Sequence, residues 1–242
     1  MKLLIDTDIT LFQVCQQSEV EIDWGDDTWT LETDLREAKD RFVKKIKQYQ
    51  ELTGIKEFLL IISDRENFRK DINSTYKENR KDTRKPLGYK AMKEWVLENY
   101  PCDTRPKLEA DDLIAWYMTK YPGEYQIVSM DKDFMQVPGR FFRISPKGEH
   151  KLHEITPEAA NKFLMTQIIM GDATDGYYGI PGIGPKKAEA WLDKHGYNFE
   201  SVVKMYEANG MTRQDAVMEA RMARLLTADE YVDGKVKLWN PK

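Results

Sequence analysis

Short apolar runs alternate with longer amphipathic stretches along the first half of the chain. The runs at 3–5, 58–62 and 125–129 have the length of buried strands. Between the first two, apolar residues recur at helical spacing over 35–49, and Gly54 ends the pattern. Because parallel strands need a crossover connection, this alternation of strands and helices predicts a mainly parallel α/β sheet flanked by helices.

Further elements of this half follow from similar patterns. Alternating apolar residues on either side of Gly25 indicate a hairpin, and Pro101 sets the end of a helix that precedes it. The predicted elements are a hairpin at 20–33, helices at 89–99 and around 113–117, and a fourth strand at 141–145.

The pattern becomes helical after residue 155. Thr156 and Pro157 supply a capping hydroxyl and a first-turn proline for a helix that runs to Gly171. We predict further helices at 186–195, 199–208 and 212–226, and a last hairpin closed by Asp-Gly at 233–234. The chain is therefore divided into an α/β core, residues 1–155, and a helical subdomain, residues 156–242.

Composition is that of an ordinary globular protein. A chain of 242 residues with 41% hydrophobic content can bury one substantial core with a small appended subdomain. The longest apolar run, 58–62, is far too short for a membrane helix, and the first residues lack the apolar segment of a secretory signal. Cys15 and Cys102 show no metal-ligand spacing and are expected to be free thiols. We expect a cytoplasmic protein with no membrane association.

Charge is unevenly distributed. The formal net charge of -4 argues mildly against a nucleic-acid partner. Between residues 65 and 90, however, nine Lys and Arg face four acids, a surplus of five. The basic residues are Arg65, Arg69, Lys70, Lys77, Arg80, Lys81, Arg84, Lys85 and Lys90. On charge alone, this stretch is equally well explained as a solvated polar loop.

Each of the three clearest strands runs into an aspartate. Asp6 follows the first, Asp64 the second, and Asp131 the third, with Asp133 close behind. In a parallel sheet these positions share the carboxyl edge, where open α/β sheets bind ligands. A single such residue is more simply a turn or capping Asp. Three in register favour a shared site.

Two more acidic clusters join them. Glu109, Asp111 and Asp112 open a helix, and Asp172 and Asp175 lie in a glycine-bounded turn. First-turn acids and an Asx turn are structural alternatives for the two clusters. Brought together, so many carboxylates would repel and raise one another's pKa values, a conflict that divalent cations resolve. All-oxygen ligands suit Mg²⁺ or Mn²⁺, and two ions about 4 Å apart can activate a water and stabilise a leaving oxygen.

A glycine-rich segment, 179–188, follows the second cluster and enters a helix at Lys186 and Lys187. Glycines let backbone N–H groups approach a phosphate, and the helix N-terminus and lysines attract the anion. A plain interhelix turn has a similar sequence. The position directly after the acidic turn makes the phosphate-binding interpretation more specific.

In this order and spacing, the motifs resemble those of the structure-specific 5′ nuclease superfamily, which includes flap endonucleases and the 5′ nuclease domains of bacterial DNA polymerases. The likeness covers residues 1 to about 190. It is carried by Asp6, 63–64, 68–69, 76–80, 109–112, 131–134 and 171–188. Within that superfamily the chain looks most like the 5′→3′ exonucleases of T7-type bacteriophages, through 5–8, 79–81, 172–177, 222–224 and 238–239. The implied fold is PIN/5′-nuclease-like, with a helix-hairpin-helix at about 166–195.

The resemblance also assigns roles. One metal ion would be held by Asp6, Asp64, Glu109 and Asp111, with Asp112 in or beside that shell, and a second by Asp131, Asp133, Asp172 and Asp175. Lys77 and Arg80 match the catalytic basic pair beside the scissile phosphate. Tyr76 would stack on a terminal base. The implied DNA-binding residues are Tyr76, Lys81, Gly182, Gly184, Lys186 and Lys187, with K⁺ at the helix-hairpin-helix.

At two positions the resemblance does not assign a role. Asp8 is either a further ligand or only the cap of the following helix. Gly176 stands where the superfamily usually has Asn, so a hydrogen bond made by that side chain elsewhere cannot be assumed.

The function implied is a metal-dependent 5′→3′ exonuclease of phage DNA replication, a monomer that cuts DNA, and RNA of RNA–DNA hybrids, to 5′-phosphorylated products. The alternatives are a flap endonuclease of branched DNA and an inactive module that binds DNA through the hairpin alone. Because residues 65–108 leave and return to the acidic edge, we expect a basic helical arch there, beneath which a frayed 5′ end passes.

Overall fold

A six-stranded sheet forms the centre of the computed structural model, which describes residues 1–241. Its strand order is β5-β4-β1-β6-β7-β8. The strands are β1 (Lys2–Asp6), β4 (Phe58–Ile61), β5 (Cys102–Asp103), β6 (Tyr125–Ser129), β7 (Gly139–Arg143) and β8 (Lys151–Ile155). All neighbours pair in parallel except β7 and β8. Ile5 lies in register with Leu60 and Val128, so the carboxyl ends of β1, β4 and β6 meet at one edge.

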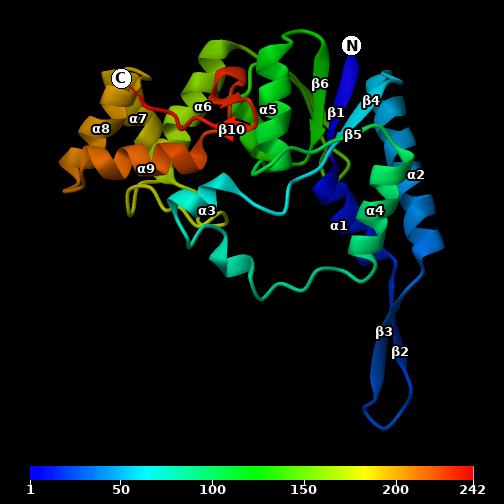
Figure 1. Cartoon of the computed structure of the whole chain (residues 1–242). Coiled ribbons are helices and arrows are strands. Elements are labelled where there is room, and N and C mark those ends of the chain that lie inside the picture. Colours follow the sequence, from blue (N-terminus) through cyan, green and yellow to red (C-terminus); the bar gives the residue numbers. More distant parts are fainter. Residues whose placement is uncertain (242) are drawn as a thin grey trace.

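Helices cover both faces of this sheet, as Figure 1 shows. On one face lie α1 (Thr7–Gln17), α2 (Leu35–Thr53) and α4 (Tyr89–Asn99), whose apolar side chains pack with Leu3 and Ile5 of β1. The other face packs Leu4 against α5 (Ala110–Lys120). Successive residues of β1 thus point to opposite faces, and its apolar run is buried on both sides.

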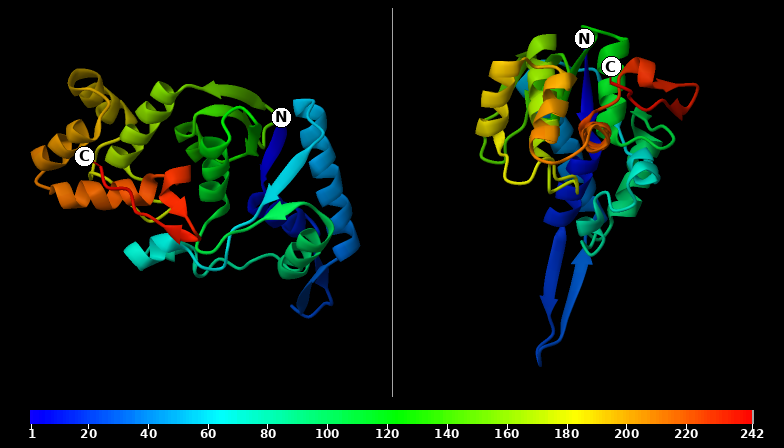
Figure 2. Two further views of the ribbon diagram at one scale, coloured as in Figure 1. Left: turned by 45° about the horizontal axis from the view of Figure 1, so that its top comes forward. Right: turned by 90° about the vertical axis from the view of Figure 1, so that its left-hand side faces the viewer.

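A hairpin of β2 (Glu19–Asp23) and β3 (Trp29–Thr33) projects from the body as a separate two-stranded sheet (Figures 1 and 2). Trp24 and Trp29 are exposed on it. At its base, both Glu19 carboxylate oxygens accept from Arg84, at 2.6 and 2.8 Å, and one accepts from the Leu87 amide. The hairpin therefore anchors the end of the basic stretch to the body.

The rest of the chain is mostly helical and has its own apolar cluster. Its elements are α6 (Pro157–Met170), α7 (Pro185–His195), α8 (Phe199–Ala208), α9 (Arg213–Ala223), the 3₁₀ turn η3 (Ala228–Glu230), β9 (Tyr231–Val232) and β10 (Lys235–Val236). After α9 the chain returns to the sheet: Leu225, Leu226 and Tyr231 join the core beneath α5, and Trp116 donates its indole N–H to the Tyr231 carbonyl.

The predicted fold class is confirmed: a mainly parallel sheet lies between helices and is followed by helices. The predicted elements at 89–99, 125–129 and 199–208 match the observed bounds. The antiparallel edge strand β8 was missed because its sequence, Lys-Leu-His-Glu-Ile, is only weakly apolar. The helix predicted to reach residue 226 ends at Ala223. No helix among residues 1–241 has the length and apolar character needed to cross a membrane.

Candidate metal and DNA-binding site

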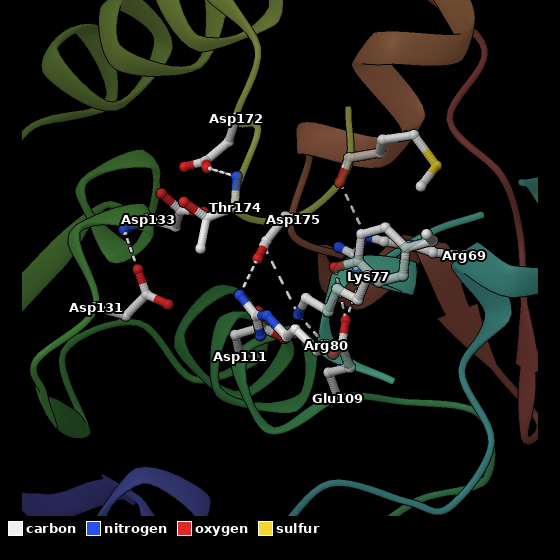
Figure 3. Close-up of polar contacts among 12 residues, drawn as sticks. Arg69, Lys77, Arg80, Glu109, Asp111, Asp131, Asp133, Asp172, Thr174 and Asp175 are labelled. Carbon is white, nitrogen blue, oxygen red and sulfur yellow. Dashed lines mark hydrogen bonds and ion pairs between the residues drawn. The ribbon is translucent and has the colours of Figure 1, made fainter. Parts of the chain in front are cut away.

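Acidic side chains from four parts of the chain form a group at the carboxyl edge of the sheet, hereafter the acidic ring, and Figure 3 shows those from three of the parts. Two lie at the ends of β1 and β6. The Ser129 hydroxyl donates to Asp6 at 2.8 Å and accepts from the Asp131 amide at 3.0 Å. The Asp131 carboxylate in turn accepts from the Asp133 amide at 2.9 Å and caps the 3₁₀ turn η2 (Lys132–Gln136). One serine therefore links the acids of two neighbouring strands.

The start of α5 supplies the next acids. Oxygens of Glu109, Asp111 and Asp112 lie within 4.8 Å of one another. The Ser63 hydroxyl, after β4, accepts from the Ala110 amide at 2.9 Å and so fixes this helix start at the sheet edge. Carboxylates packed this closely are the donors of a hard divalent cation.

The loop between α6 and α7 brings the last two acids. Asp172 accepts from the Thr174 amide at 2.9 Å and pairs with Lys132 Nζ at 2.9 Å. Asp175 pairs with Arg80 and lies 3.7 Å from Lys77 Nζ. The acidic turn is therefore held on one side by η2 and on the other by the basic stretch.

Lys77 bridges two parts of the ring. Its ammonium donates to Glu109 at 2.7 Å, and its backbone amide donates to the Asp175 carbonyl at 3.1 Å. Gly176 permits this approach, because a Cβ there would lie 3.1 Å from the Lys77 nitrogen. The departure from Asn at this position thus has a local reason: the basic stretch packs directly on the turn.

Burial and mutual repulsion raise the pKa values of several acids of the ring. Burial, with Asp8 nearby, raises the pKa of Asp6 to about 7, and burial with Asp131 nearby does the same for Asp133. Burial and Asp112 raise the pKa of Asp111 well above its usual range. For Glu109, Lys77 and Arg69 overcome burial and lower the pKa to about 2.

One buried oxygen of Asp133 has no hydrogen-bond partner among residues 1–241. An unpaired buried polar atom is costly. Together with the raised pKa values and the all-oxygen donor set, it fits a ring built to bind divalent cations.

Arg69 was missed as a site residue. Fully buried on the short helix α3 (Phe68–Ile72), it donates to both Asp112 oxygens, at 2.6 and 2.9 Å, and to Glu109 at 3.3 Å. It also donates to the carbonyls of Met222, in the last turn of α9, and of Arg224, directly after that helix. The Phe68-Arg69 motif marked this residue, but nothing in the sequence showed which groups it contacts. Both carboxylate oxygens of Asp112 are therefore occupied by hydrogen bonds from the Arg69 guanidinium.

Three predicted residues have contacts other than those expected. Asp64 accepts from the Lys107 amide at 2.8 Å, and such backbone donors lower its pKa although burial opposes them. The Tyr76 ring is buried and its hydroxyl donates to Glu109 at 2.9 Å, so the ring is not free to stack in this conformation. The exposed Lys81 pairs with Glu78. Their assigned roles stay predictions.

Asp8 does not cap the helix with its side chain. Its carboxylate accepts from the Ser63 amide at 2.9 Å and from the Tyr89 hydroxyl at 3.1 Å. It therefore joins α1 to the end of β4 and to the start of α4.

The glycine-rich loop lies between α6 and α7. Its backbone crosses the end of α6 so closely that a Cβ on Gly171 would lie 2.3 Å from the Tyr178 carbonyl carbon, and one on Gly179 2.4 Å from the Gly171 nitrogen. Glu219 of α9 accepts from the Gly179 amide at 2.9 Å. Gly182 and Gly184 have open space around them, and Lys186 and Lys187 are exposed at the start of α7.

The basic stretch crosses from α3 to α4 through the 3₁₀ turn η1 (Glu78–Arg80), past the acidic ring (Figures 1 and 3). Its helix, α4, packs against α1 and α2 through Met92 and Val96, so residues 73–88 form the part that spans the edge. Beneath them, a cleft of about 510 Å³ is lined by residues of α1 and by Arg80, Lys85 and Tyr89.

The fold and the acidic ring define the class: an α/β protein whose mainly parallel sheet carries, at its carboxyl edge, a cluster of carboxylates suited to divalent metal ions. The chain belongs to the 5′-3′ exonuclease family, since residues 3–162 match that family's N-terminal resolvase-like domain.

Two curated relatives match nearly the whole chain. The exodeoxyribonuclease of Enterobacteria phage T3 is 29% identical and the exonuclease of Escherichia phage T7 is 27% identical; each alignment covers 99% of this chain and 93% of the relative. Among solved structures, a T5 5′-exonuclease mutant aligns with a TM-score of 0.66 at 15% identity, covering 92% of this chain and 87% of its own. A T5 flap endonuclease complex with DNA and metal ions gives 0.64 at 16%, covering 92% and 88%. These structures share the fold.

Proposed function

We propose that this protein is a divalent-metal-dependent 5′→3′ exonuclease that hydrolyses DNA phosphodiester bonds from 5′ ends. The observation that carries the proposal is the acidic ring, with its unpaired Asp133 oxygen, lying directly against Lys77 and Arg80. The relatives from phages T3 and T7 are named exodeoxyribonuclease and exonuclease, and their alignments span both parts of the chain. The phage origin of these relatives supports the setting that we propose, which is phage DNA replication in the host cytoplasm.

The ring contains two sets of ligands. Asp6, Glu109 and Asp111 would hold one ion, with Asp64 joining them once its carboxylate leaves the Lys107 amide. Asp112 would support this set through Arg69. The second ion would be held by Asp131, Asp133, Asp172 and Asp175. Mg²⁺ or Mn²⁺ suits these oxygen donors, and the bound pair would activate water and stabilise the leaving oxygen.

Lys77 and Arg80 would receive the scissile phosphate. Both side chains are held in place before substrate arrives: Lys77 pairs with Glu109, and Arg80 pairs with Asp175. A preorganised positive charge stabilises the negative charge that develops on phosphate oxygens during hydrolysis. With the 3′ oxygen as the leaving group, the products would carry 5′ phosphates.

Duplex would be held away from the cut by the glycine-rich loop. Its amides, the N-terminus of α7, and Lys186 and Lys187 offer a phosphate site, with K⁺ bound by the loop. Lys81 would contact the strand near the arch. The 5′ end would fray and pass beneath residues 73–88 into the cleft lined by Lys85 and Tyr89. Such threading requires a free end.

The test uses 5′-labelled blunt, nicked, flapped and RNA-primed duplexes, each with Mg²⁺ or with EDTA, and sizes the products. Short 5′-terminal products from blunt and nicked duplex are expected. Cleavage confined to the flapped substrate would instead identify a flap endonuclease, and a lack of cleavage everywhere an inactive binding module. Cleavage of the RNA primer would extend the substrate to hybrids, and sedimentation would test the expected monomer.

The site assignment is tested by Asp131→Asn, with Asp27→Asn on the exposed hairpin tip as the matched control. The first should lose activity by orders of magnitude and keep duplex affinity, whereas the second should keep both activity and affinity. Near-normal rates for Asp131→Asn at saturating Mg²⁺ would overturn the assignment.

Threading of the 5′ end is tested with two substrates that have no free end. A covalently closed circle, or a duplex with a protein fixed to the 5′ nucleotide, should resist digestion; rapid cleavage of either would rule out threading.

A further inference from the structure

A second hollow lies beside the cleft, between α1, α2 and the loop 144–150, with a volume of about 400 Å³. We propose that this hollow, the glutamine pocket, binds single-stranded DNA that has passed beneath residues 73–88. The proposal rests on the proposed function, because it concerns the path of the 5′ strand beyond the acidic ring.

The lining of the glutamine pocket suits a nucleotide strand. Four glutamine amides, from Gln13, Gln16, Gln17 and Gln48, surround it, and Lys45 adds a positive charge. Amides both donate and accept, so they can pair with the edges of any base. No carboxylate is among the residues that line it in the described part of the chain. The chain as a whole has 41 Asp and Glu and 37 Lys and Arg, whereas the lining has one lysine and no Asp or Glu.

The pocket is continuous with the cleft. Gln13 and Gln16 line both, and Gln13 Nε2 contacts Met130 Sδ at 2.9 Å, which holds this side chain at the junction. Met130 itself lies between Ser129 and Asp131 of the acidic ring. A strand leaving the ring through the cleft would therefore meet the glutamine pocket next.

Charge opposes a path of the strand that continues past the C-terminal end of α1. That helix leads to the projecting hairpin, where residues 19–33 contain six acids and no Lys or Arg. The acids are Glu19, Glu21, Asp23, Asp26, Asp27 and Glu32. A phosphate backbone is repelled there and attracted to the carboxylate-free pocket, so the strand is steered from the end of α1 into the pocket.

The length of α1 sets the distance that the strand must cover from the cleft to the glutamine pocket. Nine residues separate Asp8, in the cleft, from Gln17, in the pocket, which at about 1.5 Å per residue is about 14 Å along α1. At about 3.4 Å per stacked nucleotide, that is roughly four nucleotides. Shorter overhangs should not reach the pocket.

The first test measures binding of duplexes with 5′ overhangs of increasing length, in EDTA so that no cleavage occurs. Lys45→Glu should weaken binding of an overhang of about eight nucleotides by about fivefold, and leave blunt duplex and an overhang of about two nucleotides unchanged. Lys44→Glu, the same charge change one residue away outside the pocket, is the matched control and should have little effect. Equal effects at all lengths, or none at any, would overturn the proposal.

The second test locates the strand by cross-linking, with a thiol-reactive group at one overhang position at a time. Gln17→Cys should react only at overhang positions at least roughly four nucleotides from the duplex, because the four nucleotides counted from Asp8 to Gln17 are a minimum. Thr28→Cys on the hairpin should not react, and the wild-type protein, with buried Cys15 and half-buried Cys102, gives the background. Reaction at Thr28→Cys without reaction at Gln17→Cys would refute the path. Neither test needs activity, so a protein that binds overhangs this way and cleaves nothing would refute only the proposed function.

Discussion

Replacing Asp112 with Asn should destabilise the protein strongly, because it leaves the buried Arg69 guanidinium without its counter-charge. Arg69 is 1% exposed and Asp112 is 0% exposed. Burial alone would lower the pKa of the guanidinium, but Asp112 raises it well above its usual value, so the arginine stays charged. The substitution preserves the size of the side chain and removes its charge.

The expected cost follows from the type of contact. Removing one partner of a buried ion pair costs about 3–5 kcal/mol, and the retained amide oxygen places Asp112→Asn near the lower end, about 3 kcal/mol. In a chain of this size, that lowers the melting temperature by roughly 6–12 °C. The loss is a large part of the roughly 5–15 kcal/mol that stabilises a typical protein.

Urea unfolding in EDTA measures the effect, and two variants serve as controls. Glu200→Gln breaks an exposed pair with Arg213 and should cost less than about 1 kcal/mol. Asp111→Asn should leave stability unchanged or raise it, because burial and Asp112 raise the pKa of Asp111 and the amide removes that repulsion. If Asp112→Asn costs under about 1 kcal/mol, or if Asp111→Asn costs as much, the reasoning is wrong.

Three further predictions follow from the site and its loop. In EDTA, stability should fall as the pH rises from about 4 to about 7. The pKa values of Asp6 and Asp133 are raised to about 7, so across this window the unfolded chain binds fewer protons than the folded one. Denaturant titrations at several pH values check this, and a rise in stability over the window would contradict it. Lys77→Ala should depress the single-turnover rate by about two orders of magnitude with little change in duplex affinity. Lys187→Ala should instead weaken duplex binding and make its salt dependence shallower, and the reverse pattern would exchange their roles. Gly179→Ala should lower the melting temperature and weaken duplex binding, because the new Cβ would lie 2.4 Å from a backbone nitrogen at the end of α6. A normal melting curve would refute that packing argument.

Much of the fold could be predicted because its elements carry their own local patterns. The buried strands are short apolar runs, and Asp34 and Gly54 bound α2 with a side-chain cap and a left-handed turn. The positions of acids at strand ends were predictable for the same reason: register in a parallel sheet is set by the strands. The edge strand β8 has no such pattern and is defined by its pairing with β7.

The directions of individual side chains were less predictable. A motif places Asp64 at the end of a strand, but whether its carboxylate faces the ring depends on the Lys107 amide, 43 residues later in the chain. Arg69 depends on carbonyls 153 and 155 residues away. The end of α9 is also set at long range, since the Leu225 amide donates to the Gln136 side chain and leaves the helical path. Such contacts exist only once the tertiary fold has formed.

The backbone contact between Gly171 and Gly179 closes the turn that lies between them. The Ile180 amide donates to the Ile169 carbonyl at 2.8 Å and stabilises this closure. Asp172 and Asp175 lie inside this closed turn, and the loop proposed to hold duplex begins where it ends. Under the proposed function, the loop that holds the duplex and the acids that bind the metal ions are therefore parts of one continuous, closed segment. The protein would measure a constant interval from the held backbone to the bond it breaks, and its products would be uniform in length. An insertion within the turn would change that interval, whereas a longer loop elsewhere would not.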